Sequence, residues 1–135
     1  MATNVAGARG WGAHRIDPVT VEKTVSFNTS GIGAGVFWFR IPARAQITSC
    51  LVNVETAFNA GTTNVLTIGY GASLNEIVAA GDVDESSATA QSVTTGNSLE
   101  FSEEKDVYVK YAQTGTAATA GKARIVLSYT VGEGI

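Results

Sequence analysis

The chain has 135 residues and a mass of 14.0 kDa, which corresponds to one domain and excludes a multidomain enzyme. Hydrophobic residues make up 44% of it and charged residues only 16%, while glycine contributes 15 residues, a composition that favours strands joined by small-residue turns. The formal net charge of -3 argues against nucleic acid as a partner, because binding to a phosphate backbone needs a basic surface.

Charge is divided unevenly along the sequence. Residues 1–44 carry five basic and two acidic side chains, whereas residues 45–135 carry four basic and ten acidic ones. This asymmetry suggests a basic face that meets an acidic face on another copy or on a larger assembly. An ordinary solvated surface is the alternative interpretation.

The first 17 residues have neither a period of two nor a period of 3.6, which predicts an extended N-terminal arm before a β domain at 18–135. Trp11, between two glycines, is expected either to fold back on its own domain or to anchor the arm on a neighbour.

No apolar run is long enough for a signal peptide or a membrane span, so we expect synthesis in a cytosol and no membrane partner. The lone cysteine, Cys50, is expected to be a small buried hydrophobe.

The first two strands follow this arm. Alternation over residues 19–27 predicts a half-buried strand, with Lys23 as the one charged residue on its apolar side. The glycine pattern of residues 31–35 resembles that of a phosphate-binding loop, but such a loop needs a helix after it and a strand follows here. We therefore interpret these glycines as supplying the positive φ angles of a wide hairpin. Residues 36–41 then form a strand with apolar side chains on both faces, expected as Val36, Trp38 and Arg40 on one and Phe37, Phe39 and Ile41 on the other.

The remaining elements also repeat every two positions. Residues 47–58 predict a long central strand, residues 66–70 another, and residues 77–80 a short strand or a single helical turn. Further strands are expected around residues 91–95, 99–101, 107–111 and 123–131. About eight short strands without a convincing helix predict an all-β chain, a single antiparallel β-sandwich that is jelly-roll-like.

Few residues suggest chemistry. Asp82, Asp84 and Glu85 lack the spacing of a calcium loop, so we interpret them as part of a solvated acidic loop. The only histidine, His14, has no nucleophile as a partner. The acidic segment at residues 100–106 is expected to be an exposed turn and not a pair of glycosidase carboxylates, unless a deep cleft surrounds two of them. We therefore expect no catalytic residue, no metal and no cofactor, and no enzyme activity.

Several local patterns point to one class of viral proteins. GYG at residues 69–71 ends a strand and is followed by AAGDVD at residues 79–84; a charged turn and a Val-x-Val strand occupy residues 103–109; AGKARI at residues 120–125 opens the last strand. Over about the last two-thirds of the chain, this arrangement resembles the small structural proteins of tailed bacteriophages, which often act as head decoration or cement proteins.

The resemblance implies a non-enzymatic virion protein that binds the outer capsid surface, with the major capsid protein and its own copies as partners, as a trimer or else a dimer. A tail or head-tail component is one alternative. A carbohydrate-binding sandwich that stacks sugars on Trp38, Tyr70 or Tyr108 is another. Because arginine pairs with carboxylates through two hydrogen bonds and positive charge gathers in the first third of the chain, the interface candidates are Arg9, Trp11, Arg15, Arg40 and Arg44.

Overall fold

The computed structural model describes residues 18–132, so Arg9, Trp11, His14 and Arg15 of the expected arm lie outside the described residues. Within this range the chain is all-β, as the period of two predicts, and no helix is long and apolar enough to span a membrane. The strands are β1 (Val19–Ser26), β2 (Val36–Ile41), β3 (Ala45–Thr56), β4 (Thr63–Gly69), β5 (Ala90–Val93), β6 (Lys105–Thr114) and β7 (Lys122–Val131).

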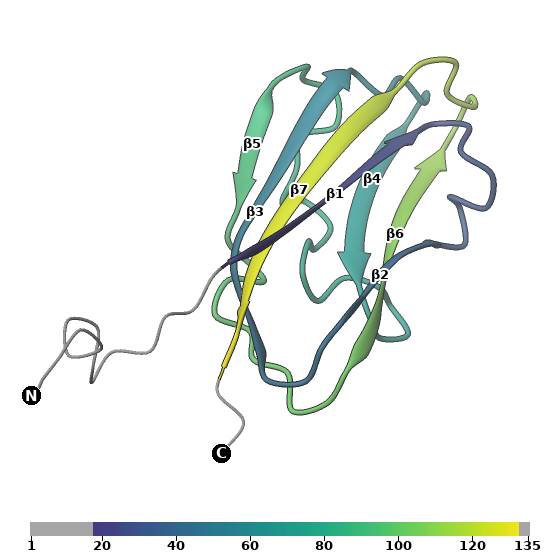
Figure 1. Cartoon of the computed structure of the whole chain (residues 1–135). Helices are drawn as coiled ribbons and strands as arrows, with labels where there is room; N and C mark the ends of the chain where they lie inside the picture. Colours follow the sequence, from purple (N-terminus) through teal and green to yellow (C-terminus); the bar gives the residue numbers. More distant parts are fainter. Residues whose placement is uncertain (1–17, 133–135) are drawn as a thin grey trace, which may run out of the picture.

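The strands pair as one long antiparallel ribbon that is folded at its middle. β1 pairs with β7, β2 with β6 and β3 with β5, so each pair lies inside the previous one in the sequence. Rolling the ribbon brings β3 beside β7 and β4 beside β6. The result is a sheet with the order β1-β7-β3-β5 and a second sheet with the order β2-β6-β4, as Figure 1 shows. This nested pairing confirms the predicted jelly-roll-like sandwich.

A complete jelly roll has eight strands, and the position after β4 is reduced here to one bridge between Ile68 and Val78. Residues 77–80 are therefore neither the short strand nor the helical turn that the sequence suggested. Residues 99–101 were also expected to form a strand, but only Glu100 makes a bridge, to Gln46. Both segments are too short to extend a ladder beyond one pair.

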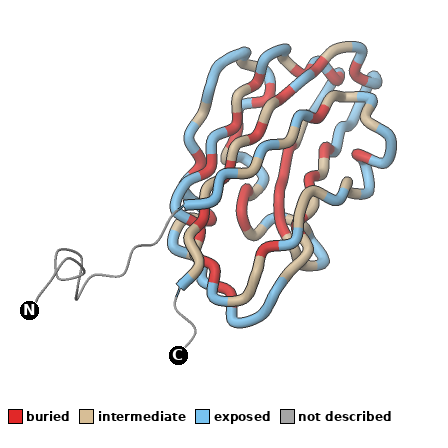
Figure 2. Tube along the Cα trace, in the orientation of Figure 1, coloured by how far each residue is buried: buried red, intermediate tan, exposed pale blue. Residues whose placement is uncertain are grey.

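The core lies between the two sheets, where buried positions alternate with exposed ones along the strands (Figure 2). The rings of Phe58 and Tyr111 meet in this core with centroids 4.7 Å apart. Gly121, with a φ of 149°, packs directly against Phe58 and leaves no room for a Cβ atom. Cys50 is buried as predicted, and burial raises the pKa of its thiol to about 12.

Bulges explain where the sequence pattern fails. In β2 the register against β6 shifts between Phe37 and Phe39, so Phe37 and Arg40 share the outer face with Tyr108 and Asp106. The expected division of β2 into alternating faces is therefore wrong, because one extra residue reverses the alternation. Trp38, at the bulge, packs against the core together with Phe39.

The glycine-rich loop was only partly predicted. Gly31 and Gly35 have φ angles of 80° and 116°, which glycine adopts without steric cost. However, the loop joins β1 to β2, and these strands belong to different sheets. It is a crossover between the two layers of the sandwich and not a hairpin.

Candidate functional site

The outer face of β2 and β6 carries the most varied group of side chains on the described surface. Phe37 is 49% exposed, and its ring meets the ring of Tyr108 edge to face at a centroid distance of 5.7 Å. These two residues are directly opposite each other in the ladder, as are Arg40 and Asp106. Residues that face each other across an antiparallel pair project to the same side of the sheet. All four side chains are thus held by two rigid strands.

Arg40 is fixed by carboxylates from the opposite strand and its entry turn. Its Nε donates to Oδ1 of Asp106 at 2.7 Å and its Nη2 to Oδ2 at 3.4 Å, while Nη1 lies 3.6 Å from Oε1 of Glu104. The two bonds to Asp106 form a bidentate pair, which fixes the orientation of the guanidinium group. The positive charge of this predicted interface residue is therefore already paired within the chain.

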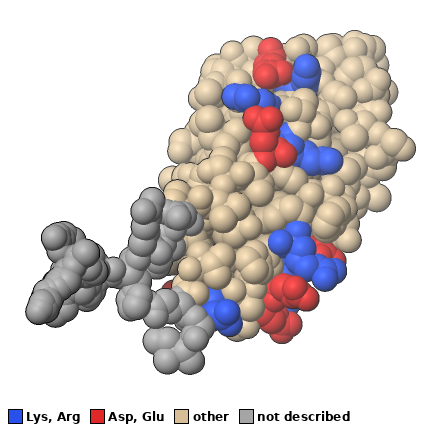
Figure 3. Space-filling model, viewed as in Figure 1, with Lys and Arg blue, Asp and Glu red and all other residues tan. Residues whose placement is uncertain are grey.

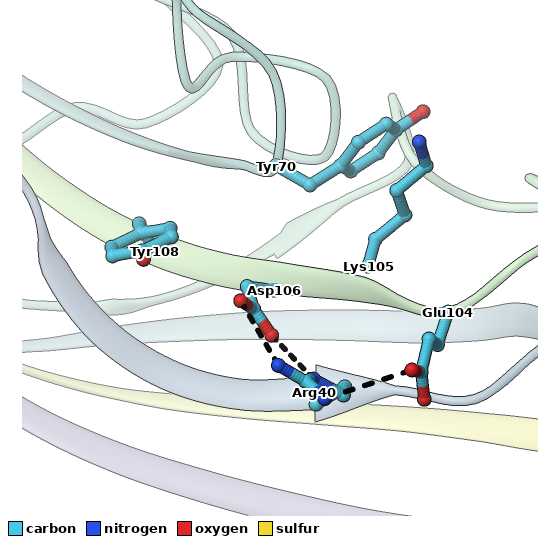
Figure 4. Close-up of a pocket in the computed structure, with 6 residues that line it drawn as sticks. All are labelled: Arg40, Tyr70, Glu104, Lys105, Asp106 and Tyr108. Atoms are coloured by element: carbon cyan, nitrogen blue, oxygen red, sulfur yellow. Dashed lines mark hydrogen bonds and ion pairs between the residues drawn. The ribbon is translucent and has the colours of Figure 1, made fainter.

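An open hollow of about 350 Å³ lies beside this ion pair. Figure 4 shows Tyr70 and Lys105 on one side of it and the pair of Arg40 and Asp106 on the other. The ring of Tyr70 is supported from below by Phe101, with centroids 5.1 Å apart. The remaining residues that line the hollow are Glu104 and Tyr108.

The carboxylates of the hollow do not have the character of a glycosidase pair. The hydrogen bond from Arg40 lowers the pKa of Asp106 despite partial desolvation, and the same bond raises the pKa of Arg40. A glycosidase acid needs the opposite shift, towards a raised pKa that keeps the proton available. Asp106 therefore does not have the raised pKa of such an acid, and its pairing with Arg40 holds both groups in a fixed orientation.

Arg44, the other predicted interface residue within the described range, lies at the opposite side of the β2–β3 turn. Its φ of 66° is unusual for a residue with a side chain, and backbone hydrogen bonds to Phe101 and Gly132 hold it there. The side chain is exposed and makes no ion pair with a described residue. It borders a second hollow with Glu100, Phe101 and Ser102.

The acidic loop after β4 has a structural role. Oε2 of Glu85 accepts the backbone N–H of Leu66 at 2.8 Å, and Glu85 is only 6% exposed. Asp82 accepts the N–H of Ala79 and the hydroxyl of Thr95, and Asp84 accepts from Ser86. No group of three metal-ligating side chains occurs in the range 18–132.

Basic and acidic side chains of the described residues lie beside one another in ion pairs. Figure 3 shows blue and red side chains next to each other, and the ion pairs join distant parts of the chain. Arg40 pairs with Asp106, Glu22 with Arg124 at 3.0 Å, and Lys122 with Glu55 at 3.6 Å. The charge asymmetry of the sequence is therefore partly cancelled by the fold, because antiparallel pairing places early residues beside late ones.

Phe37 is the residue of this surface that the sequence analysis missed. An alternation of two predicted that it would share a face with Phe39 and Ile41, away from Arg40. The excess of consecutive apolar residues in the strand was a signal that the alternation is broken, but it does not identify the bulged position. Of the three aromatic residues suggested as a sugar platform, Tyr70 and Tyr108 line one hollow, whereas Trp38 does not line it.

No family model matches the chain, and no curated protein matches it in sequence. Solved structures do share its fold. One is a chain of "Cyanophage Pam1 capsid asymmetric unit", with a TM-score of 0.66 at 16% identity over 87% of this chain and 86% of that one. Another is from "Acidic stable capsid structure of Helicobacter pylori bacteriophage KHP30", with a TM-score of 0.63 at 14% identity over 87% of this chain and 90% of that one. A third, from "Capsid of Ralstonia phage GP4", has a TM-score of 0.59 at 18% identity over 89% of this chain and 86% of that one.

These similarities establish the sandwich architecture over nearly the whole of each chain. At 14% to 18% identity the shared feature is the fold alone.

Proposed function

We propose that this chain is a structural protein of a bacteriophage particle that binds the outer surface of the assembled capsid and stabilises it without catalysis. The observation that carries the proposal is the fold shared with chains from three phage capsid structures, each matched over at least 86% of its length. Those chains are therefore single sandwiches of similar size. A small closed sandwich is suited to attachment on a shell because its loops and edges offer docking surfaces.

The binding surface in this proposal comprises the basic N-terminal third and the loop edges. Arg44 is the most accessible described candidate because its guanidinium group has no described ion-pair partner. Arg40 would bind through the preformed pair with Asp106. The other proposed contacts are Arg9, Trp11 and Arg15, and the proposed partners are the major capsid protein and further copies of this chain, as a trimer or a dimer.

The test is to compare particles that contain the protein with particles produced without it. Loss of infectious particles on heating and on exposure to a chelator is measured for both, and purified protein is added back to the depleted particles. We expect the depleted particles to be more sensitive and the added protein to restore resistance. Equal sensitivity, with the protein located only at the tail by electron microscopy of labelled particles, would instead identify a tail or head-tail component.

Arginine substitutions sharpen this test. Exposed charges mainly steer encounter and contribute under about 1 kcal/mol each. Arg44→Ala should therefore slow binding to depleted particles modestly, whereas combining it with Arg9→Ala and Arg15→Ala should abolish binding. Arg40→Ala is a less direct probe, because it also releases Asp106 and Glu104 from their pairing.

A further inference from the structure

We infer that the outer face of β2 and β6 at Phe37 and Tyr108, together with the hollow that Tyr108 lines, is a binding site for a neutral hexopyranose, the six-membered sugar ring of a surface glycan. This site is separate from the arginine and arm contacts proposed for capsid binding, apart from Arg40. It rests on two neighbouring features: an exposed aromatic wall and a rigid, charge-neutral set of hydrogen-bonding groups.

The aromatic wall consists of Tyr108, which lines the hollow, and Phe37, which contacts Tyr108 but does not itself line the hollow. Among residues 18–132, Phe37 is the one aromatic residue whose side chain is exposed and not buried or half-buried. It is kept in position by the ladder pair and by the edge-to-face contact with Tyr108. The C–H face of a pyranose is apolar and slightly positive, so it packs favourably on the electron-rich face of such a ring.

Hydrogen-bonding groups lie beside this wall. Arginine has five N–H donors, and Asp106 uses two of those on Arg40. The Asp106 carboxylate retains free lone pairs, and Tyr70 also lines the hollow (Figure 4). Neighbouring sugar hydroxyls can donate to a carboxylate and accept from a guanidinium group at the same time. Because the ion pair already orients both groups, little side-chain freedom is lost on binding.

The charges select a neutral ligand. The hollow is lined by two cationic side chains, Arg40 and Lys105, and two anionic ones, Glu104 and Asp106, so its formal charge is zero. A phosphate or sulfate group would be attracted by Arg40 and Lys105 but repelled by the carboxylates of Glu104 and Asp106 that line the same hollow. A protein partner fits less well, because the cores of protein interfaces are depleted of charged residues and four charged side chains line this hollow.

The experiment uses the full chain and the methyl glycosides of glucose, galactose, mannose and N-acetylglucosamine. Binding is followed by saturation-transfer NMR and by titration of labelled backbone amides. We expect at least one glycoside to bind with a Kd on the order of millimolar, with the shifted amides at β2 and β6. Phe37→Ala and Asp106→Asn should each weaken that binding at least about fivefold.

Leu51→Ala is the matched control, since Leu51 is 37% exposed on the other sheet, and its binding should equal that of the unchanged chain. Failure of all four glycosides to bind overturns the proposal, as does binding that Phe37→Ala leaves unchanged. If Phe37→Ala instead reduces attachment to depleted particles without any sugar binding, the surface is a protein contact. Particle stability does not depend on sugar binding, so this proposal and the capsid proposal can fail separately.

Discussion

β4 and β1 are edge strands of the two sheets, and they differ in whether their outward backbone N–H groups have hydrogen-bond acceptors. The N–H groups of Leu66, Ile68 and Tyr70 in and after β4 point away from β6, and each has a partner. The carboxylate of Glu85, the carbonyl of Val78 and the carboxylate of Glu76 accept them at 2.8, 3.1 and 2.9 Å. The loop that replaces the eighth strand thus provides three hydrogen bonds without forming a ladder.

Along β1 such cover is limited, within the described residues, to its last residue, where the N–H of Ser26 donates to Oγ1 of Thr29 at 2.8 Å. Just after β1, the N–H of Phe27 donates to the carbonyl of Gly121, which continues the register of β1 against β7. Because hydrogen-bonded residues alternate along an antiparallel pair, the odd-numbered residues of β1 are the ones that bond to β7. The N–H groups of Thr20, Glu22 and Thr24 therefore point outwards, because alternate residues of an antiparallel pair face opposite edges. Side-chain and loop oxygens thus cap the outward N–H groups of β4 from Leu66 to Tyr70, whereas among the described residues of β1 only Ser26 is capped.

The largest expected effect tests the open edge with two adjacent proline substitutions. Proline at Lys23 removes a hydrogen bond to β7, whereas proline at Thr24 removes only an outward N–H group. Lys23→Pro should therefore lower the free energy of unfolding by about 2–3 kcal/mol more than Thr24→Pro, which corresponds to about 10 °C in Tm. Both proteins are measured by thermal and urea unfolding. Equal losses would mean that the outward groups of β1 are bonded after all.

A second prediction concerns the closed edge. Glu85→Ala leaves the buried N–H of Leu66 without an acceptor, which should cost about 1–3 kcal/mol of stability. Glu85→Gln is the matched control, because its amide oxygen still accepts that N–H group and carries no charge. We expect the glutamine variant to be close to the unchanged chain in urea unfolding. If alanine and glutamine are equally harmful, the charge and not the hydrogen bond is what matters.

The two carboxylates of the closed edge should respond to pH with opposite signs. Burial raises the pKa of Glu85, only partly opposed by the Leu66 N–H. Burial also acts to raise the pKa of Glu76, but the N–H groups of Gly71 and Tyr70 outweigh it and the pKa is lowered. A lowered carboxyl pKa gives stability above the unfolded-state pKa that is lost as pH falls, whereas a raised one gives stability that is lost as pH rises.

Stability is therefore measured between about pH 3 and pH 7, which spans the ordinary titration of glutamate. Glu76→Gln should make the loss of stability towards low pH shallower. Glu85→Gln should make it steeper, because it removes a group whose protonation favours the folded state in acid. Slopes that change in the same direction for both variants would contradict the assignment.

The smallest effect is expected for the ion pair between Glu22 and Arg124, which ties the outer face of β1 to β7. Both side chains are about half exposed, so Glu22→Gln should cost under about 1 kcal/mol, and less in high salt. Thr20→Ala, on the same face of β1, is the comparison. A loss of several kcal/mol would show that this pair and not the ladder holds the edge strand.

The sequence predicted the fold where the alternation of two is unbroken. In β6 and β7 the positions expected inside, such as Val107, Val109 and Leu127, are buried. In β3 the buried positions change from odd to even after Ile47, because the register slips between Ile47 and Ser49. A bulge of one residue leaves no mark in composition, so its position cannot be found from local periodicity.

The candidate site was less predictable than the fold. Arg40, Tyr70 and Tyr108 were singled out from the sequence, but not the pairing of Arg40 with Asp106, 66 residues later in the chain. That pairing depends on the register of β2 against β6, which is a long-range property. Glu85 had been interpreted as part of a solvated loop, and its burial follows from the missing strand beside β4, which no local pattern indicates.

The nested ribbon also determines how the molecule responds to mechanical force. Val19, at the start of β1, is paired with Tyr129 near the end of β7, so both ends of the described chain leave the sandwich at the same pole (Figure 1). The ladder bonds run perpendicular to the strands. A tension that separates these two ends therefore opens β1 from β7 like a zipper, one pair at a time, whereas a load applied across opposite poles must shear all the pairs together. A partner that held the opposite pole as well would therefore load the ladders in shear, and the described sandwich would resist that load far better than a pull on its two ends alone.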